Sequence, residues 1–431
     1  MKTVKTRLSE MLARLKYNPL NPDSKKRGIA LILAMMSLMF MVYIATEVTR
    51  DSAVEYIVNS QELARLKAFY AARNGMQIAL LRIKIYQQAV LAPLPESAME
   101  IIDRIGWKDP FFWPLPIPKD LNTVDKDAVE EINSGSLLDA TYSHTIEDEG
   151  SKIDVNDLAS PSKVLREITK KQLLNVFEQK ISTDDDFRAE YQNIRFDELI
   201  NRVIDWMSDS NTAASGDGDK RSAFSQLGTG YPPNRGFRTI EELRLVPGMT
   251  DVFFDLLAPR ITIYGMKAIN PNTASKAVLL SLDSGITESA VDAAIERRKD
   301  PEKGGPFKGE GQKCFTNFKE FIDNRDGTRL SKEFDKIPMI CNKVFNFRIK
   351  STGLYGSGKF ALQKNITAVV FDISKAASRI KGYVDKEKLA ENPQPPNPQN
   401  PGGTNPGSTS GAPTQDPLPK GAPRVVYWSE K

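Results

Sequence analysis

Five residues with oxygen-rich side chains gather in one short stretch between residues 205 and 219. They are Asp205, Asp209, Asn211, Asp217 and Asp219, interspersed with serines and glycines. Calcium takes roughly six to eight oxygen ligands from carboxylates, amides, hydroxyls and backbone carbonyls, and a glycine-rich loop can wrap to provide them. The spacing does not fit an EF-hand loop, and an exposed acidic loop is the commoner alternative for such a run. The residues alone leave both interpretations open.

No group of residues in the sequence points to catalysis. His144 is the single histidine and falls in a predicted strand, where we expect a half-exposed side chain, so no nucleophile–histidine–acid triad is available. No glycine-rich phosphate motif precedes a predicted helix. Asp184, Asp185 and Asp186 are adjacent carboxylates that are expected to form an exposed turn. We therefore predict that the protein is not an enzyme.

The chain contains two cysteines, Cys314 and Cys341. Two are too few for a cysteine-rich metal site or a disulfide scaffold. They can pair if this part of the chain lies in an oxidising compartment. The sequence does not report how far apart they lie, so a disulfide and two separate thiols both remain possible.

The formal net charge of +4 is unevenly distributed. Residues 1–28 hold eight Lys and Arg residues against two acidic ones, so the rest of the chain is slightly negative. Binding to a nucleic acid calls for a basic stripe on the folded part, and none is evident. We expect no nucleic-acid partner.

Residues 29–46 contain neither charge nor proline. As a helix they would measure about 27 Å, enough to cross the hydrocarbon core of a membrane. The basic cluster precedes this stretch, which predicts a cytoplasmic N-terminus and an extracytoplasmic body. Apolar and small residues then recur at three- and four-residue steps up to Pro93, so we predict one helix of about 60 residues. Its parts are a transmembrane segment at 29–48 and a continuation at 49–92.

The body after this helix combines strands and helices. Residues 141–147 and 152–155 alternate polar and apolar side chains around a turn at 148–150, which predicts a hairpin within a first strand region, 93–155. A second hairpin is predicted at 343–375, with its turn at 355–358, and the two should form one antiparallel sheet against the second half of the long helix. Residues 391–431 are rich in Pro and Gly and are predicted to be a disordered tail. The apolar VVYW near the end is expected to be the end of that tail, with a short docking motif as the alternative.

Two mostly helical modules are predicted between the sheet strands, at 156–265 and 266–342. Each contains a helix, a turn and a second helix, with turns at LVPGMT and LDSGIT, so they are SAM-like or helix-hairpin-helix in pattern. Nucleic-acid-binding hairpins use a G-x-G turn whose amides meet phosphate. Thr250 and Thr287 replace the second glycine, which argues against binding of DNA.

Several segments resemble those of the type II secretion minor pseudopilin K (GspK) family. KKRG at 25–28, followed by an apolar run, resembles a prepilin peptidase site; FYAARNGMQIALLRI at 69–83 and EDEGSKIDVNDL at 147–158 resemble GspK segments. The resemblance implies cleavage after Gly28, with Ile29 as the methylated first residue of the mature protein. Leu33 then stands where major pilins carry a Glu that neutralises a neighbour's N-terminus, and absence of that Glu is a GspK feature.

The resemblance implies an α+β, pilin-like fold with the helical modules as an insertion. The protein would be a single-pass inner-membrane protein with a periplasmic body, which caps or nucleates the pseudopilus tip. Its partners would be the I- and J-type minor pseudopilins, the major pseudopilin, the prepilin peptidase and the inner-membrane assembly platform. GspK proteins bind calcium near the DW…DS segment, which favours calcium at 205–219.

The long helix would pack against the helices of other subunits through small residues, which permit close approach. These are Ala64, Ala68, Ala71, Ala72 and Gly75. The alternatives are a minor pilin of a type IV pilus, a membrane-tethered DNA receptor and an ordinary single-pass scaffold.

Overall fold

The structure, a computed structural model, describes most of the chain. The described residues are 22–92, 94–116, 123–136, 139–216, 218–309, 311–325, 327–356, 358, 361–391 and 421–431, without the side chains of 22–27, 96 and 123–125. Of the predicted segments, the leader up to residue 21, Asp217 and the tail at 392–420 lie outside this set.

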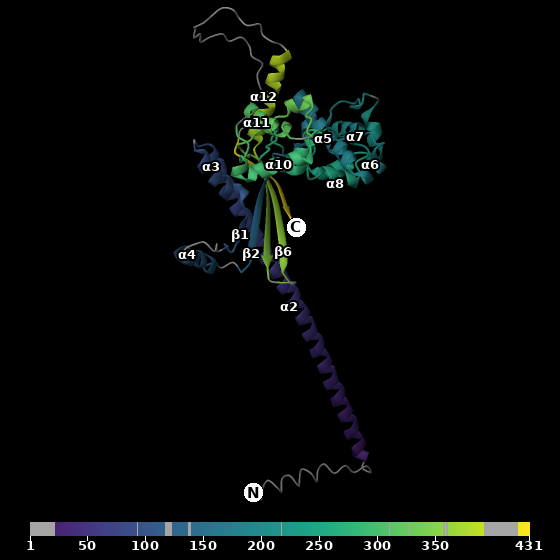
Figure 1. The fold of residues 1–431 in the computed structure, drawn as a ribbon. Coiled ribbons are helices and arrows are strands. Elements are labelled where there is room, and N and C mark those ends of the chain that lie inside the picture. The colour runs from purple at the N-terminus through teal and green to yellow at the C-terminus, as the bar shows by residue number, and fades with distance from the viewer. Residues whose placement is uncertain are drawn as a thin grey trace, which may run out of the picture.

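One long helix, α2 (Pro22–Val90), forms the axis of the molecule (Figure 1). At 1.5 Å per residue it is about 100 Å long. Within the described chain it is the one helix whose length and composition suffice to cross a membrane, with a mean hydropathy of 2.4 in its most apolar window. The single helix predicted from the proline-free pattern is therefore confirmed. Its N-terminal half extends away from the rest of the molecule, and its C-terminal half lies against the sheet.

The main sheet has five strands in the order β1-β2-β5-β6-β7, and all neighbours are antiparallel. They are β1 (Phe111–Trp113), β2 (Thr141–Asp148), β5 (Phe347–Tyr355), β6 (Leu362–Phe371) and β7 (Arg424–Glu430). A shared core joins this sheet to α2, with Met76, Ile83 and Tyr86 of the helix facing Phe347 and Ile349 of β5. The predicted hairpin at 343–375 and the predicted contact of the sheet with α2 are confirmed.

Two strand predictions are wrong. Residues 141–155 do not form a hairpin, because β2 pairs with β1 and β5, whereas β3 (Ile153–Asp154) pairs in parallel with β4 (Ile261–Thr262) in a separate small sheet. The tail prediction fails at 424–430, because β7 pairs with β6 through Val369–Tyr427 and Ala368–Trp428. The apolar residues near the C-terminus thus complete the sheet.

Two hydrophobic cores fill the helical part. The first is built from η2 (Val155–Ala159), α5 (Lys163–Thr183), α6 (Asp185–Tyr191), α7 (Phe196–Met207), η3 (Lys220–Leu227), η4 (Ile240–Leu245) and α8 (Asp251–Leu257). The second is built from α9 (Lys276–Ser281), α10 (Glu288–Lys299), α11 (Gln312–Asp323) and η6 (Lys332–Lys336), whereas the short η5 (Pro301–Lys303) after α10 contributes no buried residue. Ile168 of α5 belongs to the second core, so α5 joins the two modules.

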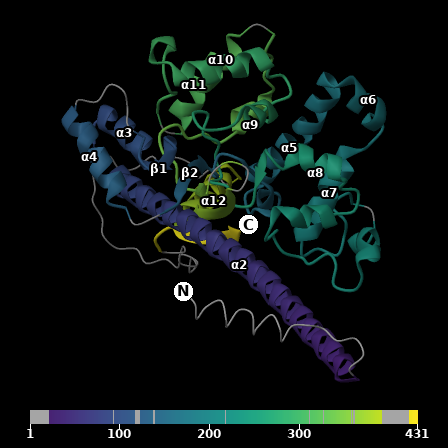
Figure 2. The ribbon, with the colours of Figure 1, turned by 90° about the horizontal axis from the view of Figure 1, so that it is seen from below.

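The remaining helices lie around the sheet and the modules. They are α3 (Glu96–Asp103), η1 (Arg104–Lys108), α4 (Thr123–Ser134) and α12 (Ile373–Glu391). Seen from below, α12 lies near the centre of the view, with α9–α11 of the second module above it and α5–α8 of the first module to its right (Figure 2). Glu387 of α12 accepts hydrogen bonds at 3.0 Å from the backbone N–H groups of Lys163 and Val164 and so caps α5. This contact attaches the end of the sheet to the helical modules.

Candidate functional site

The segment 147–158, here called the junction segment, connects the sheet to the helical modules. It leaves β2 at Asp148 and enters β3 and η2. Glu149 is fully buried and accepts hydrogen bonds from Arg348 Nε (2.7 Å) and Nη2 (2.6 Å) of β5, and from Thr262 Oγ1 (2.6 Å) of β4. Although burial opposes its charge, Arg348 and Lys152 hold the pKa of Glu149 below its usual value. One carboxylate thus joins the sheet to the first module.

A second buried carboxylate, Asp148, connects the same segment to the second module. It accepts hydrogen bonds from Thr273 Oγ1 (2.6 Å) and Ser151 Oγ (2.5 Å). Burial raises its pKa to about 6. The side chain therefore joins the end of β2 to the loop that precedes α9.

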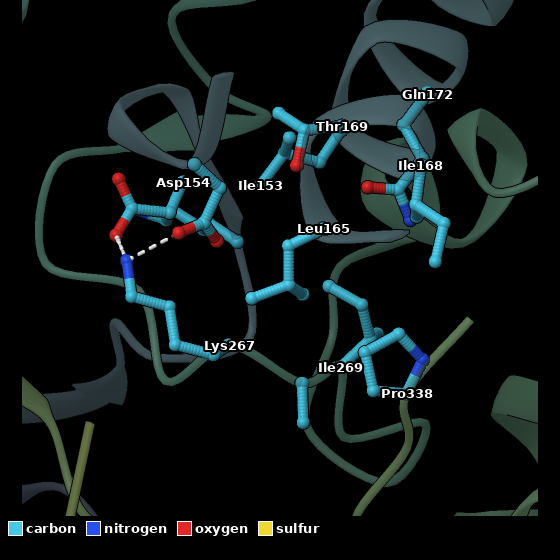
Figure 3. A pocket seen from close by; sticks show the side chains of 12 residues that line it. Ile153, Asp154, Leu165, Ile168, Thr169, Gln172, Lys267, Ile269 and Pro338 are labelled. Atoms are coloured by element: carbon cyan, nitrogen blue, oxygen red, sulfur yellow. Dashed lines mark hydrogen bonds and ion pairs between the residues drawn. The ribbon is translucent and has the colours of Figure 1, made fainter. Parts of the chain in front are cut away.

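Asp154, Asp157 and Lys267 form a buried charge cluster beside a small recess (Figure 3). Lys267 Nζ lies 2.6 Å from Asp157 Oδ1 and also pairs with Asp154, whose Oδ2 accepts a bond from Gly265 N at 3.1 Å. Although burial opposes its charge, the two carboxylates raise the pKa of Lys267. Burial, together with the charge of Asp154, raises the pKa of Asp157 to about 7.

The recess is lined partly by apolar side chains next to these ion pairs. Figure 3 shows Leu165, Ile168 and Ile269 lining the wall next to the ion pairs. The backbone O of Lys267 also accepts a bond from Tyr383 Oη of α12 at 3.1 Å. Each charged group of the cluster is thus paired with a group from another element, and the cluster ties β3 and η2 of the first module to the segment that leads into the second module.

The small residues of α2 serve its own sheet. Ala68, Ala71 and Ala72 are fully buried. A Cβ atom on Gly75 would lie 2.4 Å from Ser351 Oγ, and Ser351 Oγ donates to Ala72 O at 2.7 Å. Our prediction that the small residues of α2 pack against other subunits is therefore wrong for Ala68, Ala71, Ala72 and Gly75. Ala64 is partly exposed. The reason is that β5 approaches the helix backbone directly.

The residues of the predicted processing site lie on the exposed apolar part of α2. Ile29 is 60% exposed and Leu33 is 61% exposed, and Gly28 has no neighbour within 4 Å of its Cβ position. Such an apolar surface is suited to lipid or to the helices of other proteins. Cleavage after Gly28 stays a prediction.

The described part of the predicted calcium loop does not bring its carboxylates together. Asp205 is buried, and its Oδ1 accepts a bond from Ala214 N at 2.7 Å; Asp219 Oδ1 accepts one from Arg221 N at 2.9 Å. Asp209 and Asn211 are exposed. Over the described residues no group of three or more His, Cys, Asp or Glu side chains is arranged to hold a metal ion. The ammonium of Lys220 donates hydrogen bonds to Asp205 O of this loop and to Asn234 Oδ1 outside it.

The two cysteines, whose pairing the sequence left open, are joined in the structure. Cys314 of α11 and Cys341 form a disulfide with Cα atoms 5.6 Å apart, which ties α11 to the segment that leads into β5.

Thr250 and Thr287 are the N-caps of α8 and α10, and their hydroxyls accept hydrogen bonds at 3.3 Å from Phe253 N and Ala290 N. A capping hydroxyl explains why threonine occupies these turns. Asp184 is half-buried and caps α6, and Asp185 and Asp186 are exposed; the predicted turn is wrong, because these two residues begin the helix.

His144 of β2 is buried, with 1% of its surface exposed, so the predicted half-exposed side chain is wrong. Its ring stacks on Phe111 with centroids 5.1 Å apart, and Arg82 Nη1 lies 2.9 Å from its Nε2. Because a guanidinium can only donate, Nε2 accepts and the imidazole is neutral. Burial, and then the charge of Arg82, lowers the pKa of His144 to about 4.

We expect His144→Gln to weaken the acid sensitivity of the fold. Between pH 6.5 and about 4 the unfolded chain takes up a proton that the folded chain refuses, so stability falls as the pH falls through this window. The loss is up to about 3 kcal/mol for a shift of this size. Urea unfolding of both proteins at several pH values measures it. Asp148 and Asp157 titrate in both proteins and cancel in the difference; parallel curves would contradict the expectation.

Arg348, Lys267 and Lys220 are residues of these contacts that the sequence did not reveal. The acidic residues that bind the first two stand in a segment singled out for its resemblance, but their partners lie more than a hundred residues away. Lys220 follows directly after the predicted calcium ligands, and that adjacency was the available signal.

Residues 151–266 match the family described as "Type II secretion system (T2SS), protein K". This segment belongs to the protein K family of type II secretion systems. The resemblance to GspK predicted from the sequence is thereby confirmed, and the matched range spans β3, the first helical core and β4.

A solved structure is also similar to this chain. It is the crystal structure of the GspK–GspI–GspJ complex from enterotoxigenic Escherichia coli, with 15% identity and a TM-score of 0.46 over 74% of this chain and 95% of that chain. No curated protein matches this chain.

Proposed function

We propose that the protein is a minor pseudopilin of a type II secretion system and that it occupies the tip of the pseudopilus. The observation that carries the proposal is the position of the protein K domain. The helical modules lie at the end of the sheet opposite the apolar half of α2 (Figure 1). A subunit anchored through that apolar half would present the modules at its far end, where they obstruct addition of another subunit.

The membrane end supports the same proposal. The prepilin peptidase removes the leader after Gly28, and α2 remains in the inner membrane with its N-terminus on the cytoplasmic side and the body in the periplasm. Leu33 is exposed and apolar, so it offers no carboxylate to the N-terminus of a neighbouring subunit. An unpaired charge is costly in a membrane, so its absence suits a subunit that has no successor above it.

The partners follow from this position. The exposed apolar half of α2 would pack with the helices of I- and J-type minor pseudopilins and of the major pseudopilin, delivered through the inner-membrane assembly platform. Membership of residues 151–266 in the protein K family favours a secretion system over a type IV pilus. The threonine caps at 250 and 287 leave the helix turns without a phosphate-binding G-x-G.

Photo-crosslinking from two exposed positions tests the tip placement. A benzophenone amino acid replaces Tyr56, which is 75% exposed on α2, or Glu320, which is exposed on α11 at the opposite end. Illuminated cells should yield adducts between position 56 and other pseudopilins, and none between position 320 and the major pseudopilin. The recovered protein should begin at Ile29. Capture of the major pseudopilin from position 320 would contradict a tip position.

A further inference from the structure

Lys220 is a buried lysine in the loop predicted to bind calcium. It is 1% exposed at the start of η3. Its ammonium donates hydrogen bonds to three oxygens: Asn234 Oδ1 at 2.8 Å, Asp205 O at 3.3 Å, and Ser208 O. An ammonium has three N–H groups, so each has an acceptor. A buried lysine normally pairs with a carboxylate, whereas this one is held by carbonyl oxygens.

Backbone carbonyls and an amide oxygen are the ligands that a hard metal cation would take in such a loop. Here these oxygens converge on a nitrogen that already carries a positive charge. A divalent ion at the same point would meet that charge at contact distance, so the ammonium and the ion exclude each other. The Asp205 carboxylate is also engaged, because its Oδ1 accepts from Ala214 N.

The surrounding backbone is built around the lysine. Lys220 N donates to Asn211 O at 3.1 Å, and Thr212 pairs with Asp219 across the loop. Asn234 adopts a φ of 55°, a left-handed conformation that asparagine tolerates better than most residues, and its N–H donates to Trp206 O at 3.1 Å. The loop at 205–220 and Asn234, which together surround the ammonium, are therefore each held in place by their own backbone hydrogen bonds.

We propose that the ammonium of Lys220 is the built-in cation of the loop at 205–220, so that this loop folds without a bound divalent metal. The inference departs from the calcium site that the family resemblance implies. It is independent of the tip placement, because it concerns only the first helical module.

Thermal unfolding of the full-length protein in detergent tests the proposal, with 2 mM CaCl2 or with EGTA. Of the four tryptophans of the chain, Trp206 lies in the core of the first module, stacked 5.4 Å from Phe237, so the tryptophan fluorescence includes a signal from unfolding there. A wild-type Tm that differs by less than about 1 °C between the two conditions is expected, because a ligand that does not bind does not stabilise. Lys220→Met should lower the Tm by about 5 °C or more in both, since three buried oxygens lose their donor.

Two further variants complete the test. Arg221→Met removes the adjacent exposed cation and should leave the Tm within about 2 °C of the wild type. A calcium site of ordinary affinity would raise the wild-type Tm by about 5 °C or more at this concentration. Such a rise, abolished in Asp209→Asn/Asp217→Asn, would overturn the proposal. If Lys220→Met does not fold, the wild-type comparison with the double variant still decides.

Discussion

Gly353→Ala is expected to separate the sheet from α2. A Cβ atom at this position of β5 would lie 2.0 Å from Ala68 O and 2.4 Å from Ala72 N. Both atoms belong to the backbone of the helix, so no side-chain rotation relieves the overlap. Excess volume costs about 1–3 kcal/mol even where side chains can adjust. We expect a loss of at least about 3 kcal/mol in the free energy of unfolding, measured by urea titration of the full chain in detergent.

The matched control is Gly382→Ala in α12. No atom lies within 4 Å of its Cβ position, and alanine favours a helix over glycine by about 1 kcal/mol, so this variant should be neutral or slightly stabilising. Limited proteolysis adds a second readout, because a sheet displaced from α2 exposes the helix around Ala72. Equal stability of the two glycine variants would show that the helix and the sheet are not in direct backbone contact.

Local pattern was sufficient where an element is long or packs on its neighbours in sequence. The apolar and proline-free run predicted α2, and the two hairpin-like strands around the turn at 355–358 predicted β5 and β6. The helical modules were also recognisable, because each core is formed largely within its own range. In these cases the periodicity of one segment determines which face is buried.

Prediction failed where a distant partner decides the structure. The strand β3 has two residues and pairs with β4 more than a hundred residues later, so alternation around it could not identify that partner. The strand β7 follows a polar segment whose composition suggested disorder, although its own VVYW residues are typical of a strand. Lys220 is bound by carbonyl oxygens, which every residue type carries, so no residue type marks its site.

The acidic residues of the junction segment show how a local motif acquires its role. Glu149 lies at a point where β2 ends, and it contacts Arg348 of the sheet and Thr262 of the first module. A buried carboxylate with two hydrogen bonds from one guanidinium fixes orientation as well as distance. The junction segment therefore holds the first module in a fixed orientation relative to the sheet.

Glu149→Gln should weaken this connection strongly. The substitution removes the charge that Arg348 faces in a buried environment and leaves that guanidinium uncompensated, which costs about 3–5 kcal/mol. Glu147→Gln is the control, because its pair with Lys350 is exposed and contributes about 1 kcal/mol or less. Urea unfolding followed by tryptophan fluorescence should show an earlier transition for the first variant alone. Equal and small effects of the two would show that Glu149 does not join the protein K domain to the sheet, and the modules would then be held by α12 and the Lys267 cluster.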